Sequence, residues 1–300
     1  GHGGMGRVFQ AKDLRLDRPV ALKVVSHRGT SAVDLEAALE REAKLGASLN
    51  HNGIAAVHDF GFQGTKSYTV FEYVEGETLR RLLQKRGKFS LVETVQIASD
   101  LAAALDFAHA RGVVHRDLKP ENICFSKQGD FKILDLGIAR NVKRDLETGT
   151  YAGTPAYSSP EQAQCQPTDG KSDQYSLALV VFEMLTGTRA FEDANPTALL
   201  RMHIQELPPR PRDILPDLSD VTEAAILRAL SKDPDERFAN CQEFARELSG
   251  DVVFDSPRHV MPTAEASVRE PCQHAEGCGD DVGGCRSDGE CHAATITSWY

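Results

Sequence analysis

The chain changes its periodicity near residue 75, and this change limits the folds it can adopt. Residues 7–13 (RVFQAKD) and 19–25 (PVALKVV) are short, rich in Val and Phe, and separated by an Asp-Arg-Pro turn, which predicts two strands. Leu and Ala then recur at helical spacing over residues 34–50, and residues 53–74 return to two strands joined by a glycine-containing turn. We therefore expect a small sheet with one helix.

Beyond residue 75 the pattern is mostly helical. Residues 79–87 and 90–112 predict two helices, and a short hairpin is expected over residues 122–137. Helices interrupted by proline-rich turns are expected from 172 to 248. The chain as a whole predicts an α+β fold with three parts: a β-rich lobe at 1–74, a larger and mostly helical lobe at 75–249, and an acidic tail at 250–300.

The tail is rich in Gly, Asp and Cys and has almost no large apolar side chains. Such a segment cannot bury enough surface to offset its ordering entropy, so we expect it to be disordered or to form a very small metal-held unit. Zinc sites usually show cysteines two to four residues apart, whereas these lie six or seven apart, which favours disorder. The four cysteines are Cys272, Cys278, Cys285 and Cys291.

Charge and composition argue against several partner classes. The formal net charge of −10 disfavours nucleic acid as the main partner. The apolar runs are too short to span a membrane, and no signal segment opens the chain. The seven cysteines do not form a disulfide pattern, so we expect a reduced, cytoplasmic protein. Any membrane anchor of a longer parent protein would lie outside this span.

The first residues, GHGGMGRV, match the pattern G-x-G-x-x-G-x-V. Glycines let backbone amides approach phosphates because no side chain intervenes. Dinucleotide-binding dehydrogenases share this spacing, but there a helix follows, whereas here a strand is predicted and no βαβ unit follows. The pattern favours a hairpin over the phosphates of a nucleotide, with a plain hairpin turn as the alternative. Its residues are Gly1, His2, Gly3, Gly4, Met5, Gly6 and Val8.

A lysine follows on the second predicted strand. Lys23 in VALK matches V-A-I-K, in which the ammonium group bridges two phosphates. An ammonium in a half-buried cleft needs a carboxylate partner. The predicted helix offers Glu40 and Glu42, and the alternative for both is a solvated helix face.

The segment VVHRDLKPEN carries the strongest signal in the chain. The fixed positions of H-R-D-L-x-x-x-N are filled by His115, Arg116, Asp117, Leu118 and Asn122. DLG begins at Asp135, and GTPAYSSPE and KSDQYSLALVVFEMLTG follow. With these motifs, residues 1–249 resemble the eukaryotic-like (Hanks-type) serine/threonine protein kinases, most closely the bacterial branch. The resemblance implies truncation at the glycine-rich loop, with the strand before that loop lying upstream.

The resemblance implies roles in phosphoryl transfer from ATP. Asp117 would accept the proton of the substrate hydroxyl, and Lys119 would place positive charge beside the transferred group. Asn122 and Asp135 would supply oxygen ligands for Mg²⁺ or Mn²⁺. Lys119 together with Thr154 is typical of the class that phosphorylates Ser and Thr.

An adenine pocket is also implied. Phe71 would close its rear, and the backbone from Glu72 to Val74 would offer hydrogen bonds to adenine. The ring would be sandwiched by Val8, Ala21 and Cys124. Glu42, rather than Glu40, would be the partner of Lys23.

The remaining implied residues are regulatory or structural. Phosphorylation of Thr148 or Thr150 would order the activation segment by pairing with Arg116. His115 would be a packed structural residue, Glu161 and Arg237 a buried ion pair, and Asp173 an anchor beneath the catalytic loop. Protein substrates are the implied partners, with self-association for autophosphorylation. The alternative is a catalytically weak, pseudokinase-like scaffold. The residues that catalysis requires are present at every position that we compared, which argues against this alternative.

Overall fold

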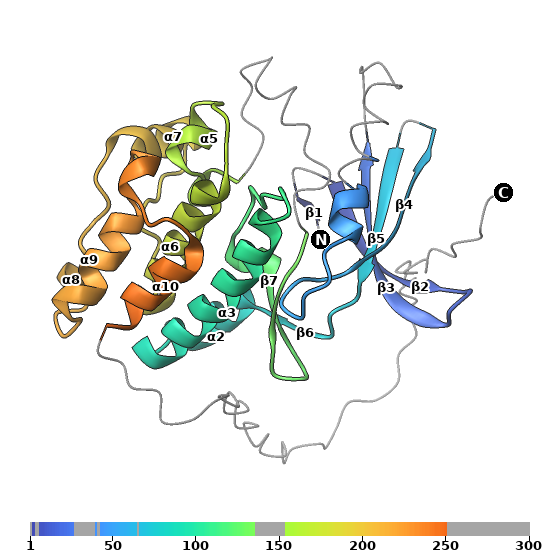
Figure 1. Cartoon of the computed structure of the whole chain (residues 1–300), viewed down its shortest axis with the longest axis horizontal. Coiled ribbons are helices and arrows are strands. Elements are labelled where there is room, and N and C mark those ends of the chain that lie inside the picture. Colours follow the sequence, from blue (N-terminus) through green and yellow to red (C-terminus); the bar gives the residue numbers. More distant parts are fainter. Residues whose placement is uncertain are drawn as a thin grey trace, which may run out of the picture.

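Two antiparallel sheets and a helical lobe make up the computed structural model of the protein, which describes residues 2–3, 6–26, 40, 43–64, 66–135 and 154–250. Figure 1 shows the larger sheet at one side of the molecule and most of the helices at the other, with the short second sheet between them. The predicted α+β fold with a β-rich and a helical lobe is confirmed.

The larger sheet has the strand order β1-β2-β3-β5-β4, and every pairing in it is antiparallel. Its strands are β1 (His2–Gly3), β2 (Gly6–Asp13), β3 (Arg18–Ser26), β4 (Val57–Gln63) and β5 (Lys66–Glu72). Side chains alternate between the faces of a strand, so one face of this sheet buries a small apolar cluster of its own. That cluster consists of Ala11, Val20, Leu22 and Val70.

The expected strands are therefore present. In addition, His2 pairs with Arg7 and Gly3 with Gly6, so two residues of the glycine-rich loop form a short strand, β1, that the sequence did not predict. Within the predicted helix at 34–50, the described residues are helical at Glu40 and over 43–47.

The second sheet has the order β6-β7-β8 and links the two lobes. Its strands are β6 (Gly76–Thr78), β7 (Ile123–Ser126) and β8 (Phe131–Ile133). The sequence predicts the β7–β8 hairpin but gives no pattern for β6, which is held by pairing to β7. A Cβ at Gly76 would lie 2.0 Å from the carbonyl oxygen of Phe125, so this close pairing requires glycine.

The helical lobe begins with two helices that the sequence predicts, α2 (Leu79–Arg86) and α3 (Leu91–His109). Ser90 and Glu93 form a reciprocal capping box that starts α3. The remaining helices are α5 (Pro160–Ala163), α6 (Gly170–Thr186), α7 (Pro196–Gln205), α8 (Pro211–Ile214), α9 (Asp220–Ala229) and α10 (Cys241–Ser249). Short 3-10 turns lie at η1 (Pro120–Asn122), η2 (Pro155–Tyr157) and η3 (Pro234–Glu236).

Helix α6 is the centre of this lobe, because nearly all of its side chains are buried. A helix that is buried on every side must lie inside the lobe rather than on its surface. Its neighbours α3, α9 and α10 pack around it. The buried polar side chains of α6, such as Asp173, therefore find their partners inside the protein.

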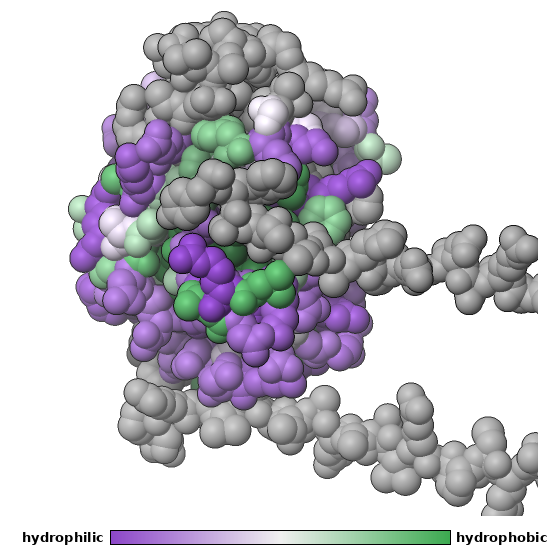
Figure 2. All heavy atoms as spheres, turned by 90° about the vertical axis from the view of Figure 1, so that its right-hand side faces the viewer, coloured by the Kyte–Doolittle hydropathy of each residue, from purple (hydrophilic) through white to green (hydrophobic). Residues whose placement is uncertain are grey.

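The surface on the strand side of the molecule is mixed. Figure 2 shows hydrophobic side chains lying among hydrophilic ones on this face. The exposed apolar residues of β2 and the turn after it are Val8, Phe9, Leu14 and Leu16. Among the described residues, no helix is both long and apolar enough to cross a lipid bilayer.

Candidate active site

The loop between α3 and β7, which carries His115 to Asn122, is fixed from below by a buried aspartate of α6. Asp173 Oδ2 accepts the backbone N–H of His115 at 2.7 Å, and Oδ1 accepts that of Arg116 at 2.8 Å. Its Oδ2 also lies 2.7 Å from Nε2 of His109. Burial opposes the charge of Asp173, but the bonds to His109 and to the loop backbone outweigh it and hold its pKa below the usual value. The expected anchor is confirmed.

This anchoring holds a backbone conformation that the loop would not adopt unaided. Arg116 has a φ of +64°, in the left-handed region that non-glycine residues rarely occupy. The backbone N–H of Arg116 is bonded to Asp173, and its carbonyl oxygen accepts a hydrogen bond from Nε2 of Gln162 at 2.7 Å. Both peptide groups beside the strained position are thus fixed.

His115 is packed inside the loop, as expected. Its ring Nδ1 lies 3.1 Å from the backbone nitrogen of Asp117, which donates to it, and Nε2 lies 3.0 Å from the carbonyl oxygen of Leu134. We assign the ring proton to Nε2, since Leu134 can only accept. With both ring nitrogens bonded and no exposed surface, His115 orients the loop and cannot serve as a base for substrate.

The side chains of Lys119, Asn122 and Thr154 are joined around Asp117. The ammonium of Lys119 lies 2.7 Å from Oδ2 of Asp117 and 2.5 Å from Oγ1 of Thr154. The amide nitrogen of Asn122 donates to the carbonyl oxygen of Asp117 at 2.8 Å and to its Oδ2 at 3.1 Å. Because that nitrogen faces Asp117, the side-chain oxygen of Asn122 is the end of the amide available to a metal.

Asp135 brings the two lobes together. It has a φ of +55°, and the residue before it, Leu134, donates its backbone N–H to the carbonyl oxygen of Asn122 at 2.7 Å. The ammonium of Lys23 lies 2.6 and 2.7 Å from the two carboxylate oxygens of Asp135. The lysine of the strand lobe thus reaches a carboxylate whose neighbour, Leu134, is bonded to the loop that ends at Asn122.

The face of the larger sheet that carries Lys23 also carries the residues expected around adenine. Lys23 lies directly opposite Val8 on β2 and Thr69 on β5, and Ala21 lies opposite Phe71. Opposed residues share a face, and so do residues two apart on one strand. Val8, Ala21 and Phe71 therefore lie on the face that turns Lys23 toward Asp135.

The connector between the lobes, residues 72–74, begins at Glu72, whose carboxylate is bonded on both sides. One oxygen of its carboxylate accepts from the ammonium of Lys132 at 2.5 Å, and the other accepts from the backbone N–H of Ala56 at 3.2 Å. Cys124 on β7 is 3 % exposed, and its sulfur lies 4.0 Å from the carbonyl oxygen of Val74. Burial raises the pKa of the Cys124 thiol to about 11, so the group is a neutral, soft surface facing the connector.

Several expected residues lie outside the described part of the chain. These are Gly1, Gly4, Met5, Glu42, Thr148, Thr150 and the tail cysteines. For His2, Gly3 and Gly6 the structure describes the backbone alone. Glu40 is described: its carboxylate pairs with Lys44 at 2.8 Å and is 56 % exposed, which agrees with a solvated helix face.

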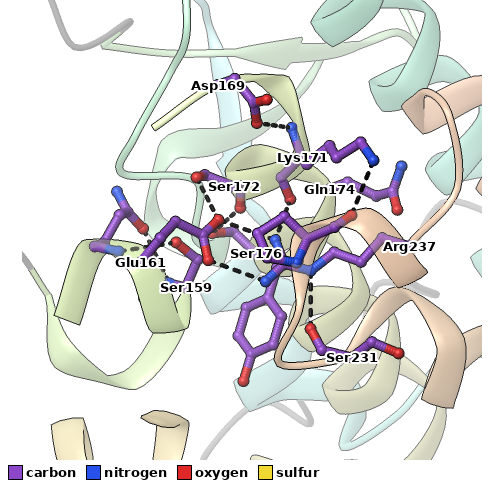
Figure 3. A network of polar contacts seen from close by, with 12 residues as sticks. Ser159, Glu161, Asp169, Lys171, Ser172, Gln174, Ser176, Ser231 and Arg237 are labelled. Atoms are coloured by element: carbon purple, nitrogen blue, oxygen red, sulfur yellow. Dashed lines mark hydrogen bonds and ion pairs between the residues drawn. The ribbon is translucent and has the colours of Figure 1, made fainter. Parts of the chain in front are cut away.

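The expected buried ion pair is present and is part of a larger network, shown in Figure 3. Two guanidinium nitrogens of Arg237 bond to the two oxygens of Glu161 at 2.9 and 3.0 Å, and Ser172 donates to Glu161 at 2.5 Å. Arg237 also donates to the carbonyl oxygen of Ser231 at 2.9 Å. Burial opposes the charge of Glu161, but the bonds from Arg237 prevail and lower its pKa.

The sequence analysis missed a second charged network, which includes Glu121 from the loop that carries Asp117. Arg80 on α2 joins Glu121 on η1, Glu183 on α6 and Tyr157 on η2. No local pattern could have found it, because Arg80 and Glu183 are 103 positions apart.

These features define a class before any relative is considered: a two-lobed fold in which a lysine of the larger sheet pairs with an aspartate beside an anchored loop of the helical lobe. The family model described as a protein kinase domain matches residues 1–248, and the chain belongs to that family. It is 38 % identical over 256 residues to the serine/threonine-protein kinase PknB of Mycolicibacterium smegmatis, covering 83 % of this chain and 41 % of the relative. It is 38 % identical over 277 residues to the serine/threonine-protein kinase pkn3 of Myxococcus xanthus, covering 88 % and 50 %.

A solved structure agrees with this assignment. The kinase domain of Mycobacterium tuberculosis PknI aligns with a TM-score of 0.68 at 28 % identity, covering 83 % of this chain and 92 % of that one. The expected resemblance to bacterial serine/threonine kinases is confirmed. The chain spans between two fifths and half the length of the two curated relatives.

Proposed function

We propose that this chain is the catalytic domain of a serine/threonine protein kinase, which transfers the γ-phosphate of ATP to Ser and Thr hydroxyls of proteins. The observation that carries the proposal is the joined arrangement of Asp117, Lys119 and Thr154 on one lobe, with Lys23 of the other lobe reaching Asp135. The carboxylate, the two ammonium groups and the hydroxyl are those that phosphoryl transfer requires.

In this proposal Asp117 is the group that receives the acceptor. Its carboxylate accepts the proton of the substrate hydroxyl and orients that oxygen for in-line attack. Lys119, bonded to both Asp117 and Thr154, places positive charge where the phosphoryl group passes. The hydroxyl of Thr154 lies beside the same ammonium and positions a Ser or Thr side chain.

The metal site would consist of Asn122 and Asp135. Both offer hard oxygen ligands, as Mg²⁺ or Mn²⁺ requires. The carboxylate of Asp135 already accepts a cationic group with both oxygens, the ammonium of Lys23, so it is directed to a position where positive charge is favourable. A bound divalent ion would neutralise charge on the phosphates of ATP.

The nucleotide would lie between the two sheets. Val8 and Ala21 would cover adenine from the larger sheet and Cys124 from the smaller one, while the backbone of Glu72 and Val74 would offer hydrogen bonds. The glycine-rich loop would cover the phosphates. Lys23 would then leave Asp135 for the phosphates and take Glu42 as its partner.

Regulation by phosphorylation is part of the proposal. Thr148 and Thr150 are the candidate acceptors, self-association would present them to a second copy, and Arg116 would pair with the phosphate. The guanidinium of Arg116 is held near the segment between α5 and α6, because its Nε donates to Thr168 at 3.1 Å. A pseudokinase-like scaffold, the alternative, would not need the complete set of groups around Asp117.

The test is phosphate transfer from labelled ATP to a generic basic protein. Asp117→Asn keeps the shape of the side chain but removes the charge, and it is expected to lower turnover at least about 100-fold. Asp217→Asn, at an exposed position, is the matched control and is expected to keep full turnover. Phosphoamino-acid analysis should find phosphoserine and phosphothreonine, and peptide mapping should find phosphate on Thr148 or Thr150.

Equal incorporation by wild type and Asp117→Asn would refute the catalytic assignment. Thermal unfolding of both proteins shows whether a lost activity reflects chemistry or loss of the fold.

A further inference from the structure

Helices α3 and α10 meet at a cluster of metal-ligating side chains that the proposed function does not use. Asp106 and His109 lie one turn apart on α3, and Cys241 is the first residue of α10, which packs against α3 (Figure 1). One ligand atom of each side chain lies within 4.8 Å of the other two. The Cys241 thiol is free and buried, whereas the side chains of Asp106 and His109 are 14 % and 15 % exposed. The cluster can therefore be reached from solvent on one side.

The carboxylate and the imidazole ring of this cluster are held in fixed orientations. Oδ1 of Asp106 accepts the backbone N–H of Cys241 at 3.0 Å and lies 3.6 Å from Nδ1 of His109. The other ring nitrogen of His109, Nε2, lies 2.7 Å from the carboxylate of Asp173, to which it donates. A metal-binding histidine commonly donates its second N–H to a carboxylate in this way. Nδ1 of His109 is thus the nitrogen available to a metal ion.

Gly170, the first residue of α6, leaves room beside that nitrogen. A Cβ at this position would lie 2.6 Å from Nδ1 of His109, so any other residue would displace the ring or cover the nitrogen. Gly170 also lines, with Asp106, His109 and Asn240, a cavity of about 440 Å³. The cavity supplies space for an ion and for a water molecule as a further ligand.

The separations in the cluster fit a four-coordinate ion. Bonds of about 2.0–2.3 Å to nitrogen, oxygen and sulfur place the ligand atoms of a tetrahedral zinc ion about 3.3–3.6 Å apart. The 3.6 Å between Asp106 and His109 lies in this range. The largest separation in the cluster is no more than 4.8 Å, which exceeds the range by about 1 Å. Side-chain rotation can close this difference.

Metal binding would leave the net charge of the cluster unchanged. In the metal-free protein, burial raises the pKa of the Cys241 thiol to about 12, so the sulfur keeps its proton. Burial opposes the charge of His109, but Asp106 and Asp173 hold its ring as the imidazolium. A divalent ion displaces one proton from Sγ and one from Nδ1 to solvent, so two positive charges replace two. No uncompensated charge is buried in the exchange.

We propose that Asp106, His109 and Cys241 bind a divalent transition-metal ion, with water from the adjoining cavity as the fourth ligand. Thiolate, imidazole and carboxylate together suit Zn²⁺, whereas Mg²⁺ and Ca²⁺ prefer oxygen ligands alone. The ion joins α10 to α3 and holds His109 against Asp173, the anchor of the loop that carries Asp117. The site is separate from the proposed ATP site, and the inference does not depend on the proposed function.

The test is metal binding by the reduced full chain after it has been freed of metal. Co²⁺ is the spectroscopic probe, because a thiolate bound to it gives a charge-transfer band and a tetrahedral site gives strong visible bands; Zn²⁺ should displace it. We expect wild type to bind one equivalent more than Cys241→Ser and one more than His109→Gln. Cys165→Ser changes a cysteine outside the cluster, so this matched control should keep the wild-type stoichiometry. All of these variants retain the four tail cysteines, so any metal bound there cancels in the comparison.

Two further measurements make the result specific. Gly170→Ala keeps the three ligands but fills the space beside Nδ1, and it should weaken Zn²⁺ binding at this site at least about tenfold. Zn²⁺ at about 100 times its Kd should raise the Tm of wild type by roughly 5–10 °C, because the ion binds only the folded cluster. The Tm of Cys241→Ser should respond much less.

Folded Cys241→Ser and His109→Gln proteins with the wild-type stoichiometry would overturn the inference, and so would a wild type whose Tm does not respond to Zn²⁺. Thermal unfolding without metal shows which variants are folded. If one ligand variant does not fold, the other ligand variant and Gly170→Ala decide the question. A protein that binds Zn²⁺ as expected but transfers no phosphate would overturn the proposed function alone.

Discussion

The two lobes hold their buried charges in different ways. In the helical lobe, Asp173 and Arg237 have no exposed side-chain surface and are bonded to several groups of the same lobe. In the strand lobe, Lys23 is 7 % exposed and makes its ion pair with Asp135, a residue of the helical lobe. The loop that carries Asp117 is thus fixed within one lobe, whereas Lys23, the proposed phosphate ligand, makes its ion pair only where the two lobes meet.

The two apolar clusters also differ in size. Among the described residues, the sheet encloses four buried apolar residues on the face turned away from Lys23, whereas the main cluster runs through the helical lobe around α6. A buried charge is stable where good geometry and several hydrogen-bonding partners compensate its desolvation. The comparison predicts that stability depends on charges of the helical lobe and that Lys23 matters mainly for nucleotide binding.

The largest effect on stability is expected for Arg237→Leu. This change leaves Glu161 charged and buried without its partner and exposes unpaired carbonyl groups, so the free energy of unfolding should fall by about 3–5 kcal/mol. Urea denaturation measures it. The double variant Glu161→Gln, Arg237→Met removes both charges and should recover part of the loss. A cost below about 1 kcal/mol for Arg237→Leu would contradict the proposed dependence on buried pairs.

A smaller effect concerns pH and the histidine beneath the catalytic loop. Burial alone would lower the pKa of His109, but its bonds to Asp106 and Asp173 raise it to about 12, from 6.5 for an ordinary histidine. Above pH 6.5 the folded state therefore binds a proton that the unfolded state has lost, so stability falls as the pH rises. Between pH 7 and 9 this group should lower the free energy of unfolding by about 2–3 kcal/mol.

The control for this pH effect is His109→Gln, which has no titrating group and should show a shallower decline over the same range. Parallel declines in the two proteins would mean that His109 is neutral in the folded state.

The smallest effect on stability is expected for Lys23→Met. Asp135 is 28 % exposed, so water can solvate its carboxylate after the ammonium is removed, and the free energy of unfolding should change by no more than about 1 kcal/mol. The KM for ATP should rise about 10-fold or more, since a charge-assisted bond to phosphate is lost. Lys12→Met, at an exposed position of β2, is the matched control and should leave KM unchanged. A large loss of stability with Lys23→Met would remove the distinction between the lobes.

The local sequence determined most of the secondary structure and indicated the family of this protein. Alternation fixed the strands of the larger sheet, because one face of each strand is buried, and Ser90 with Glu93 marked the start of α3. The motif around Asp117 indicated the family, and the expected contacts of Asp173 and of Glu161 with Arg237 are present. These features depend on residues near one another or on a motif whose spacing is fixed.

Tertiary structure alone decided which distant groups meet. Lys23 and Asp135 are 112 positions apart, and Arg80 and Glu183 are 103 apart, so no periodicity links them. Strand β6 forms only because β7 is there to pair with Gly76. In each case the packing of α6, the loop that carries Asp117 and the sheets determines which partner lies nearby. A buried charge or backbone polar group is stable only when it has such a partner.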